Sequence, residues 1–283
     1  MSKNEEVRGK LFIVASPIGN LRDITLRAIE VLGSVALIAA EDTRHSRKLL
    51  SAYGIKTRLV SVNAHSERAK SALLLKEALL GKDIAYLSDA GTPGISDPGY
   101  LLINGAIASG IQVIPIPGAS AGVAALSVSG LPMHRFLFVG FLPHNGNARK
   151  KALQELRTNG ETLILYEAPT RLLALLRDAL MVMGDRTAFI AREMTKIHEE
   201  LRRGLLSELL SVFSDREVIK GEVTLIIAGC QEREADISEQ GLKKMVRQLM
   251  EEDSLSHSQA TRTISEKTGI SRGVIYRLLL DDK

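Results

Sequence analysis

The residues of this chain that are best suited to chemistry gather in a loop that follows a predicted strand. Residues 88–99 read SDAGTPGISDPG and combine glycine, proline, hydroxyl and acidic residues. Glycine lets the backbone approach a ligand closely, and proline stiffens the loop around it. Open α/β sheets bind ligands between the end of a strand and the start of a helix. The loop matches neither the GxGxxG dinucleotide pattern nor the GxxxxGKS/T phosphate loop, so it predicts another kind of ligand site.

Three further loops of similar character follow other predicted strands. They are residues 16–20 (SPIGN), 41–45 (EDTRH) and 117–122 (PGASAG). Because the carboxyl ends of parallel strands meet at one edge of a sheet, we expect the four loops to build a single cleft. Their small side chains and backbone groups favour a neutral or cationic adenosine-type ligand over a polyphosphate.

The elements that carry these loops alternate between strand and helix in the first third of the chain. We expect strands at residues 10–15, 35–40, 83–88 and 111–116, and helices at 24–32, 43–53 and 71–80. A further helix is expected from Asp97 to about residue 109, with Asp97 as its N-cap and Pro98 at its first position. This order predicts an α/β fold with an open, parallel, Rossmann-like sheet and helices on both faces.

The middle third predicts a second α/β domain, built on a mixed sheet. Strands are expected at residues 136–140, 162–166, 187–191 and 223–228, with helices at 171–183 and 205–213. We therefore expect an N-terminal α/β domain over residues 1–130 and a second one over residues 131–232, which would complete the cleft.

Beyond a polar linker at residues 231–240 the character of the chain changes. Several positions fit the helix-turn-helix template, which has apolar and small residues in one helix, glycine at the turn, a serine cap and apolar residues in the next helix. These positions are Ile264, Ser265, Gly269, Ile270, Ser271, Ile275 and Leu278. We expect a helix-turn-helix-like tail over residues 238–283, and a plain helical hairpin that packs on the body is the alternative.

The composition excludes several classes of protein. With 283 residues, of which 45% are hydrophobic and 25% charged, the chain has the composition of a globular protein. A single cysteine excludes a disulfide framework and a cysteine-bound iron–sulfur cluster, and the histidines lack metal-binding spacing, so no metal is expected. The uncharged stretch between Asp97 and Arg135 is broken by proline and glycine, which argues against a membrane span. The polar N-terminus does not resemble a secretion signal, so we expect a cytoplasmic protein.

Basic residues form clusters that could contact nucleic acid. The chain has 37 Lys and Arg against 33 Asp and Glu, and this balance allows an RNA partner without requiring one. Each cluster could equally lie on a solvated face. The residues expected to contact RNA are Arg44, His45, Arg149, Lys150 and Lys151.

Seven motifs, in order along the chain, carry a family resemblance. They are SPIGNLRDIT, AAEDTRHS, SDAGTPGISDPG, PGASA, GFLP, YEAPTRL and an ARE segment followed by TK. Together with the tail, they resemble the tetrapyrrole methylase-like family. The resemblance implies an enzyme that binds S-adenosylmethionine between two α/β domains and works as a homodimer. It also implies methylation of the ribose 2′-hydroxyl of a cytidine in the decoding region of 16S rRNA.

The resemblance further implies which residues line the cofactor site. They are Pro17, Asp89, Ala90, Gly91, Thr92, Ile95, Ser120, Ala121, Leu142, Tyr166, Ala168 and Ala191. Methyl transfer to a hydroxyl requires in-line placement and the removal of one proton. Candidates for the proton acceptor, among which the sequence does not choose, are Glu41, Asp42, Glu167, Glu193 and Lys196.

Two other functions are compatible with the sequence. The same fold could methylate a tetrapyrrole ring or a protein side chain, although the basic residues 145–151 and the tail argue against this substrate class. A DNA-binding regulator with a metabolite-sensing domain would need a dimer to read two half-sites. The tail from Ser256 onward carries five Lys and Arg against three Asp and Glu, which is a small excess for a DNA-binding module.

Overall fold

The computed structural model describes residues 8–62, 67–230, 239–252, 255–268 and 271–280. The chain forms two compact units. The larger unit comprises residues 1–157 and 161–228, and the smaller one comprises residues 158–160 and 229–283. Among the described residues, no helix is both long and apolar enough to cross a membrane.

The larger unit begins with a parallel sheet, as the sequence predicts. Its strands lie in the order β3-β2-β4-β1-β5. They are β1 (Leu11–Val14), β2 (Leu37–Ala40), β3 (Leu59–Ser61), β4 (Ile84–Leu87) and β5 (Val113–Ile116). The helices of this part are η1 (Leu21–Asp23), α1 (Leu26–Ser34), α2 (Thr43–Ala52), α3 (Glu67–Leu79) and α4 (Tyr100–Ala108).

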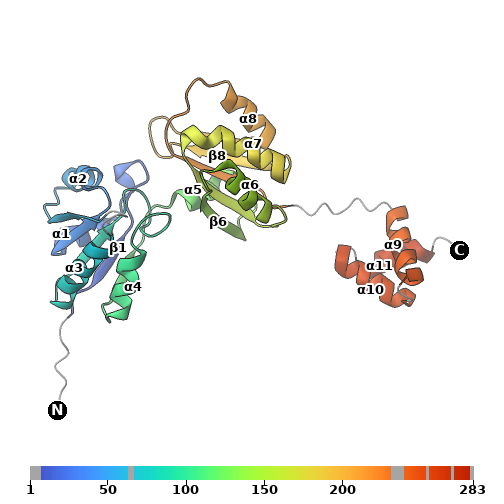
Figure 1. Ribbon diagram of the computed structural model, residues 1–283, viewed down its shortest axis with the longest axis horizontal. Helices are drawn as coiled ribbons and strands as arrows, with labels where there is room; N and C mark the ends of the chain where they lie inside the picture. The colour runs from blue at the N-terminus through green and yellow to red at the C-terminus, as the bar shows by residue number, and fades with distance from the viewer. Residues whose placement is uncertain (1–7, 63–66, 231–238, 253–254, 269–270, 281–283) are drawn as a thin grey trace, which may run out of the picture. The chain divides into compact units, whose positions relative to one another are not determined.

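Helices cover both faces of this sheet (Figure 1). On the central strand β4, Ala85 and Leu87 pack in one hydrophobic cluster with α1 and α2. Ile84 and Tyr86 pack in a second cluster with α3 and α4. Successive side chains of a strand point to opposite faces, so a strand that is buried on both sides consists of apolar residues throughout.

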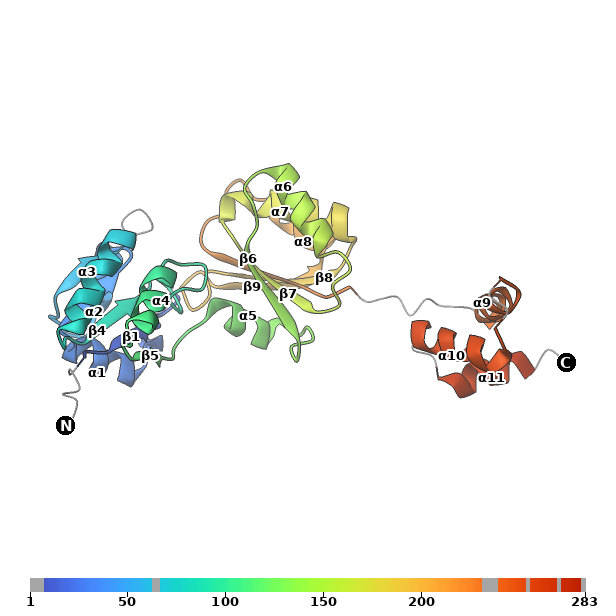
Figure 2. The ribbon, with the colours of Figure 1, turned by 60° about the horizontal axis from the view of Figure 1, so that its bottom comes forward.

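The second sheet of the larger unit is mixed, in the order β6-β7-β10-β8-β9. Its strands are β6 (Phe136–Phe141), β7 (Thr162–Glu167), β8 (Thr187–Arg192), β9 (Glu200–Leu205) and β10 (Val223–Ile227). Only β6 and β7 pair in parallel. The helices of this part are α5 (Ala121–Ser129), α6 (Gly146–Glu155), η2 (Pro169–Arg171), α7 (Leu172–Met183) and α8 (Leu206–Ser214). Helices α6, α7 and α8 cover one face and α5 covers the other (Figure 2).

Helix α4 begins later than the sequence predicts. Its first residue is Tyr100, and the N-cap is Gly99, whose φ is 131°. The prediction of Asp97 as the N-cap is wrong, because the carboxylate of Glu67 on α3 takes that role. Its Oε1 accepts hydrogen bonds from the backbone N–H groups of Gly99 at 2.9 Å and Leu101 at 3.1 Å. Asp97 is consequently left free of the helix end.

Strands β3 and β9 and helices α5 and α6 were not predicted from the sequence. Helix α6 starts within the basic segment 145–151, because Asn145 is its N-cap. The Asn145 side chain accepts hydrogen bonds from the N–H groups of Asn147 and Ala148. Helix α5 follows β5 of the first sheet but packs Ala125 and Leu126 against the second sheet. A division between residues 130 and 131 stays a prediction, and the packing of α5 favours a position nearer to residue 120.

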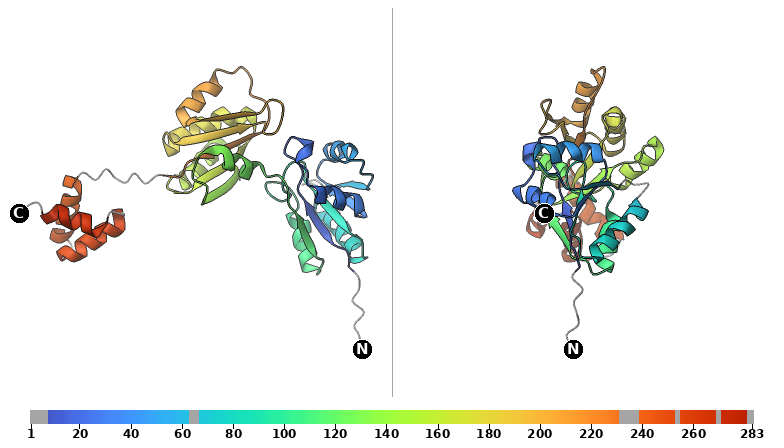
Figure 3. Two further views of the ribbon diagram at one scale, coloured as in Figure 1. Left: turned by 180° about the vertical axis from the view of Figure 1, so that it is seen from behind. Right: turned by 90° about the vertical axis from the view of Figure 1, so that its left-hand side faces the viewer.

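The smaller unit is a three-helix tail, formed by α9 (Glu239–Glu252), α10 (His257–Thr268) and α11 (Arg272–Leu280). Its core includes Leu242, Val246, Ala260, Ile264 and Ile275. The two isoleucines belong to the predicted helix-turn-helix pattern, whereas Gly269 and Ile270 of that pattern lie outside the described residues. Further views of the ribbon are given in Figure 3.

Candidate functional site

The loops that follow β1, β2 and β4 are tied together by hydrogen bonds. Ser16 and Gly91 form an isolated bridge, in which Ser16 N donates to Gly91 O at 2.9 Å and Gly91 N donates to Ser16 O at 3.1 Å. Asp42 N donates to Asp89 Oδ1 at 3.1 Å. All three strands are parallel, so their carboxyl ends meet at one edge and the loops lie side by side there.

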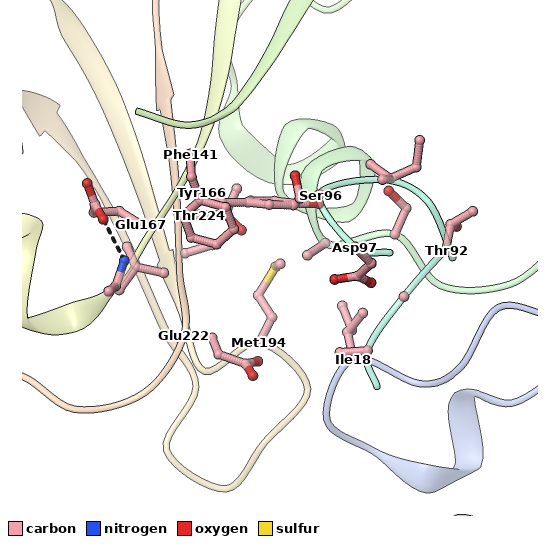
Figure 4. A pocket seen from close by; sticks show the side chains of 18 of the residues that line it. Ile18, Thr92, Ser96, Asp97, Phe141, Tyr166, Glu167, Met194, Glu222 and Thr224 are labelled. Carbon is pink, nitrogen blue, oxygen red and sulfur yellow. Dashed lines mark hydrogen bonds between the residues drawn. The ribbon is translucent and has the colours of Figure 1, made fainter. Parts of the chain in front are cut away.

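A first cavity of about 380 Å³ opens beside these loops, between the two sheets (Figure 4). Its volume lies within the range of small-molecule sites. Nine of the twelve residues that were predicted for the cofactor line it. These nine are Ala90, Gly91, Thr92, Ile95, Ser120, Ala121, Tyr166, Ala168 and Ala191.

Gly91 has the backbone conformation that the sequence analysis expected of a ligand-binding loop. Its φ is +78°, a backbone conformation that residues other than glycine adopt only at a cost in free energy. A Cβ at this position would lie 3.5 Å from the carbonyl oxygen of Ala119. A side chain at this position would therefore contact Ala119 and Ile18, and its backbone would be strained.

A second cavity of about 440 Å³ adjoins the first one. Ile18, Ala90 and Glu222 line both. Pro17 and Asp89, which were predicted for the cofactor, line this second cavity instead of the first. Leu142, the remaining predicted residue, is buried and lines neither cavity.

Aromatic side chains form the wall of the first cavity on the side of the second sheet. Tyr166 on β7 packs edge-to-face against Phe138 and Phe141, with ring centroids 5.1 and 5.7 Å away. Its hydroxyl accepts a hydrogen bond from Gly122 N at 3.0 Å, at the start of α5. This bond fixes the ring, and burial raises the pKa of the hydroxyl.

Acidic groups give the first cavity a negative character. Burial, followed by the charges of Glu41 and Asp89, raises the pKa of Asp97 to about 6. Burial also raises the pKa of Glu41, with Asp89 as the next contributor. In Figure 4 the Asp97 carboxylate and the Met194 side chain point toward one another across the cavity. No lysine, arginine or histidine is among the residues that line this cavity.

Four of the five candidate proton acceptors are held in ion pairs. Asp42 pairs with Arg44, and the hydrogen bond from Arg44 lowers the pKa of Asp42 to about 2. The remaining pairs are Glu167 with Arg171 and Glu193 with Lys196. Glu41 has no ion pair with a described residue.

Glu167 lies in the wall of the first cavity, and its side chain is fully buried. Its Oε1 accepts hydrogen bonds from Arg171 Nε at 2.5 Å and from Ala168 N at 2.7 Å. Its Oε2 has no hydrogen-bond partner among the described residues. The pair therefore fixes the backbone turn at the end of β7.

The residues predicted to contact RNA do not form one group. Arg44 and His45 are exposed at the start of α2, and Lys150 and Lys151 are partly to fully exposed on α6. Arg149, in contrast, is buried, although it was expected to contact RNA. Its side chain is only 8% exposed, and its Nη2 lies 2.6 Å from Asp178 Oδ2 on α7. A buried charge needs a partner, so Arg149 joins two helices of the fold.

Several residues of the first cavity were missed by the sequence analysis. They are Ile18, Ser96, Phe141, Pro169, Met194 and residues 222–224, with Asp97 misassigned as a helix cap, whereas Glu167 was expected as a candidate proton acceptor. Met194 lies inside the ARE–TK motif, which was the signal available for it. Residues 222–224 reach the cavity because β10 pairs with both β7 and β8, and this pairing leaves no local mark in the sequence.

Comparison with known proteins agrees with this architecture. The family of tetrapyrrole (corrin/porphyrin) methylases matches residues 10–210. The chain is 46% identical over 275 residues to the ribosomal RNA small subunit methyltransferase I of Synechocystis, covering 96% of this chain and 98% of that protein. It is 44% identical over 276 residues to the protein of the same name from Pseudomonas aeruginosa, covering 96% and 97%.

A solved structure shares the fold at lower identity. It is the uroporphyrin-III C-methyltransferase of Thermus thermophilus in complex with S-adenosylhomocysteine, with a TM-score of 0.56 and 19% identity. The match covers 77% of this chain and 97% of that one. The family model matches residues 10–210 of the 283, and the two relatives are 46% and 44% identical over nearly the whole chain, so the chain belongs to the tetrapyrrole (corrin/porphyrin) methylase family.

Proposed function

We propose that this protein is an S-adenosylmethionine-dependent methyltransferase that acts on RNA of the small ribosomal subunit. The observation that carries the proposal is the identity of 46% and 44% to proteins named for this activity, over 96% of the chain. The tetrapyrrole methyltransferase, at 19% identity, supports only the fold. An RNA substrate is therefore favoured over a tetrapyrrole.

The first cavity suits the cofactor by size and by charge. When bound, S-adenosylmethionine would supply a methyl group on a positively charged sulfur. The Asp97 carboxylate and the absence of basic residues from the lining favour such a cation. The backbone at Gly91 and the fixed ring of Tyr166, which both line this cavity, would contact the flat, neutral adenosine group.

We propose further that the methyl acceptor is the ribose 2′-hydroxyl of a cytidine in the decoding region of 16S rRNA, as the family resemblance implies. Placement of the methyl group of the donor in line with the ribose hydroxyl would provide most of the rate enhancement. The walls contributed by both sheets support this role, since they can exclude water around the donor.

A homodimer and a cytoplasmic location complete the proposal. Exposed apolar side chains support the homodimer. They include Phe136 and Phe138 on the edge strand β6 and Val123 and Val128 on α5. Apolar surface that gathers on one face is typical of protein interfaces. Ribosomal subunits as substrate would place the protein in the cytoplasm.

The proposal is tested by offering three acceptors to the purified protein with methyl-labelled S-adenosylmethionine. The acceptors are assembled small ribosomal subunits, naked 16S rRNA and a porphyrinoid. Label in RNA from either of the first two is expected. Label in the porphyrinoid alone, or in no acceptor, would contradict the proposal.

A further inference from the structure

The second cavity differs in charge from the first one, although the two share part of their walls. Its lining combines the basic residues His45, Lys48 and Lys196 with the acidic residues Asp89 and Glu222, whereas no basic residue is among the described residues that line the first cavity. Lys196 Nζ is held by Glu193 at 2.7 Å and by Glu222 at 3.1 Å, so its charge is largely compensated. His45 and Lys48 have no ion pair with a described residue. Among the described residues of this lining, Lys48 on α2 is thus the permanent positive charge that no ion pair compensates.

The wall of the second cavity also contains two buried hydroxyls that lack a partner among the described residues. Ser16 and Ser46 are 3% and 2% exposed, and neither Oγ has a hydrogen bond. A buried polar group without a partner costs free energy, so such groups are uncommon away from sites where a ligand or water satisfies them. Two of them in the wall of one cavity indicate a polar occupant.

The position of the second cavity restricts what that occupant can be. Ile18, Ala90 and Glu222 separate it from the first cavity, so a ligand in one lies beside a ligand in the other. The negative first cavity suits a cationic methyl donor, and Lys48 in the second cavity suits an anionic group of the acceptor. A methyl acceptor that carries both hydroxyls and a phosphate meets these requirements.

We propose that the second cavity receives the sugar-phosphate unit of the nucleotide to be methylated, with His45 and Lys48 facing its phosphate. This inference rests on the proposed function, because it takes RNA as the methyl acceptor. Pro17 and Asp89, which line the second cavity, would then lie beside the acceptor. Gly19 also lines this cavity, and a Cβ there would lie 2.6 Å from side-chain atoms of Thr195 and Lys196.

The test compares His45→Ala/Lys48→Ala with the parent protein and with Lys76→Ala. Lys76 is an exposed lysine on α3 that lines neither cavity, so its variant removes one charge without touching the site. Binding of labelled 16S rRNA is measured by filter retention at several salt concentrations in the presence of S-adenosylhomocysteine. Calorimetry gives the affinity for S-adenosylhomocysteine itself, and methyl transfer to small subunits is measured in parallel.

We expect the double variant to bind RNA about tenfold more weakly, with unchanged affinity for S-adenosylhomocysteine. Each lost phosphate contact should lower the salt slope by about 0.7 to 0.9. Lys48→Arg, which keeps the charge, should bind RNA as the parent does, and so should Lys76→Ala. Parental RNA affinity and salt slope in a folded double variant, alongside an active parent, would overturn this inference alone. A parent protein that does not methylate RNA would overturn the proposed function and this inference with it.

Discussion

Replacement of Asp97 by asparagine should stabilise the protein and weaken cofactor binding at the same time. The carboxylate lines the first cavity, has no ion pair with a described residue and lies near Glu41 and Asp89. Asparagine has the same shape without the charge. The substitution therefore removes the free-energy cost of a charged carboxylate that is partly buried near other carboxylates. It also removes the attraction of this carboxylate for a cation.

The gain in stability follows from the pKa of Asp97, which rises from its ordinary value of 3.8 to about 6. Between these two values the folded protein binds the proton more tightly than the unfolded chain. Stability is therefore lost as the pH rises through this window, and the cost is complete above pH 6. At 1.36 kcal/mol for each pKa unit the cost is about 3 kcal/mol, and solvent screening reduces it to about 2 kcal/mol.

At pH 7.5, Asp97→Asn should raise the free energy of unfolding by about 2 kcal/mol. For a unit of this size the thermal midpoint would rise by about 4–8 °C. The gain should shrink as the pH falls from 6 toward 4, because the carboxyl group becomes protonated in the parent protein as well. Asp215→Asn, at an exposed position on the end of α8, is the matched control and should change neither quantity.

The loss of affinity is measured by calorimetry with two ligands. S-adenosylmethionine carries one more positive charge than S-adenosylhomocysteine, so its affinity should fall by about tenfold, or about 1.4 kcal/mol, and that of the homocysteine form by less. For the parent protein, the affinity for S-adenosylmethionine should decrease as the pH falls below 6. An unchanged thermal midpoint together with unchanged affinity for both ligands would refute this reasoning.

Three other predictions concern the loop, the buried ion pair and the tail. Gly91→Val should abolish S-adenosylmethionine binding in calorimetry. It should also lower the free energy of unfolding by about 1–2 kcal/mol, because valine is strained at the φ of +78°. A folded variant with parental affinity would show that this loop is not part of the binding site. Arg149→Ala should destabilise the protein by about 3–5 kcal/mol in urea unfolding, because it leaves Asp178 buried without its main partner. The control Lys151→Ala should lower the free energy of unfolding by less than about 0.5 kcal/mol. Equal losses in the two variants would contradict the argument from burial. Deletion of residues 240–283 should leave the affinity for S-adenosylmethionine unchanged and weaken RNA binding, because the tail has its own core. Insoluble truncated protein would show instead that the larger unit needs the tail to fold.

The arrangement of the four loops could be predicted from the sequence because each strand is a short apolar run that ends in glycine, proline or acidic residues. Parallel pairing then brings those ends to one edge without further information. The loops after β1, β2 and β4 are joined by hydrogen bonds as this reasoning requires. Local sequence patterns were therefore sufficient to predict the part of the site that the parallel sheet contributes.

The sequence was a poorer guide where a side chain depends on a partner far along the chain. Asp97 followed by proline is a typical helix start, yet Glu67 on another helix caps α4 and leaves Asp97 in the cavity. Arg149 lies in a basic segment, yet its side chain is buried because it forms an ion pair with Asp178 on α7. Both differences arise from single tertiary contacts, which no local pattern records.

The most direct test of the central claim is the identity of the methylated nucleoside. Small ribosomal subunits from a strain that lacks this protein are incubated with the purified protein and methyl-labelled S-adenosylmethionine, and their RNA is digested to nucleosides and separated. The account predicts that the label is in 2′-O-methylcytidine from a single position of the decoding region. Label in a base-methylated nucleoside, or in ribosomal protein, would contradict it.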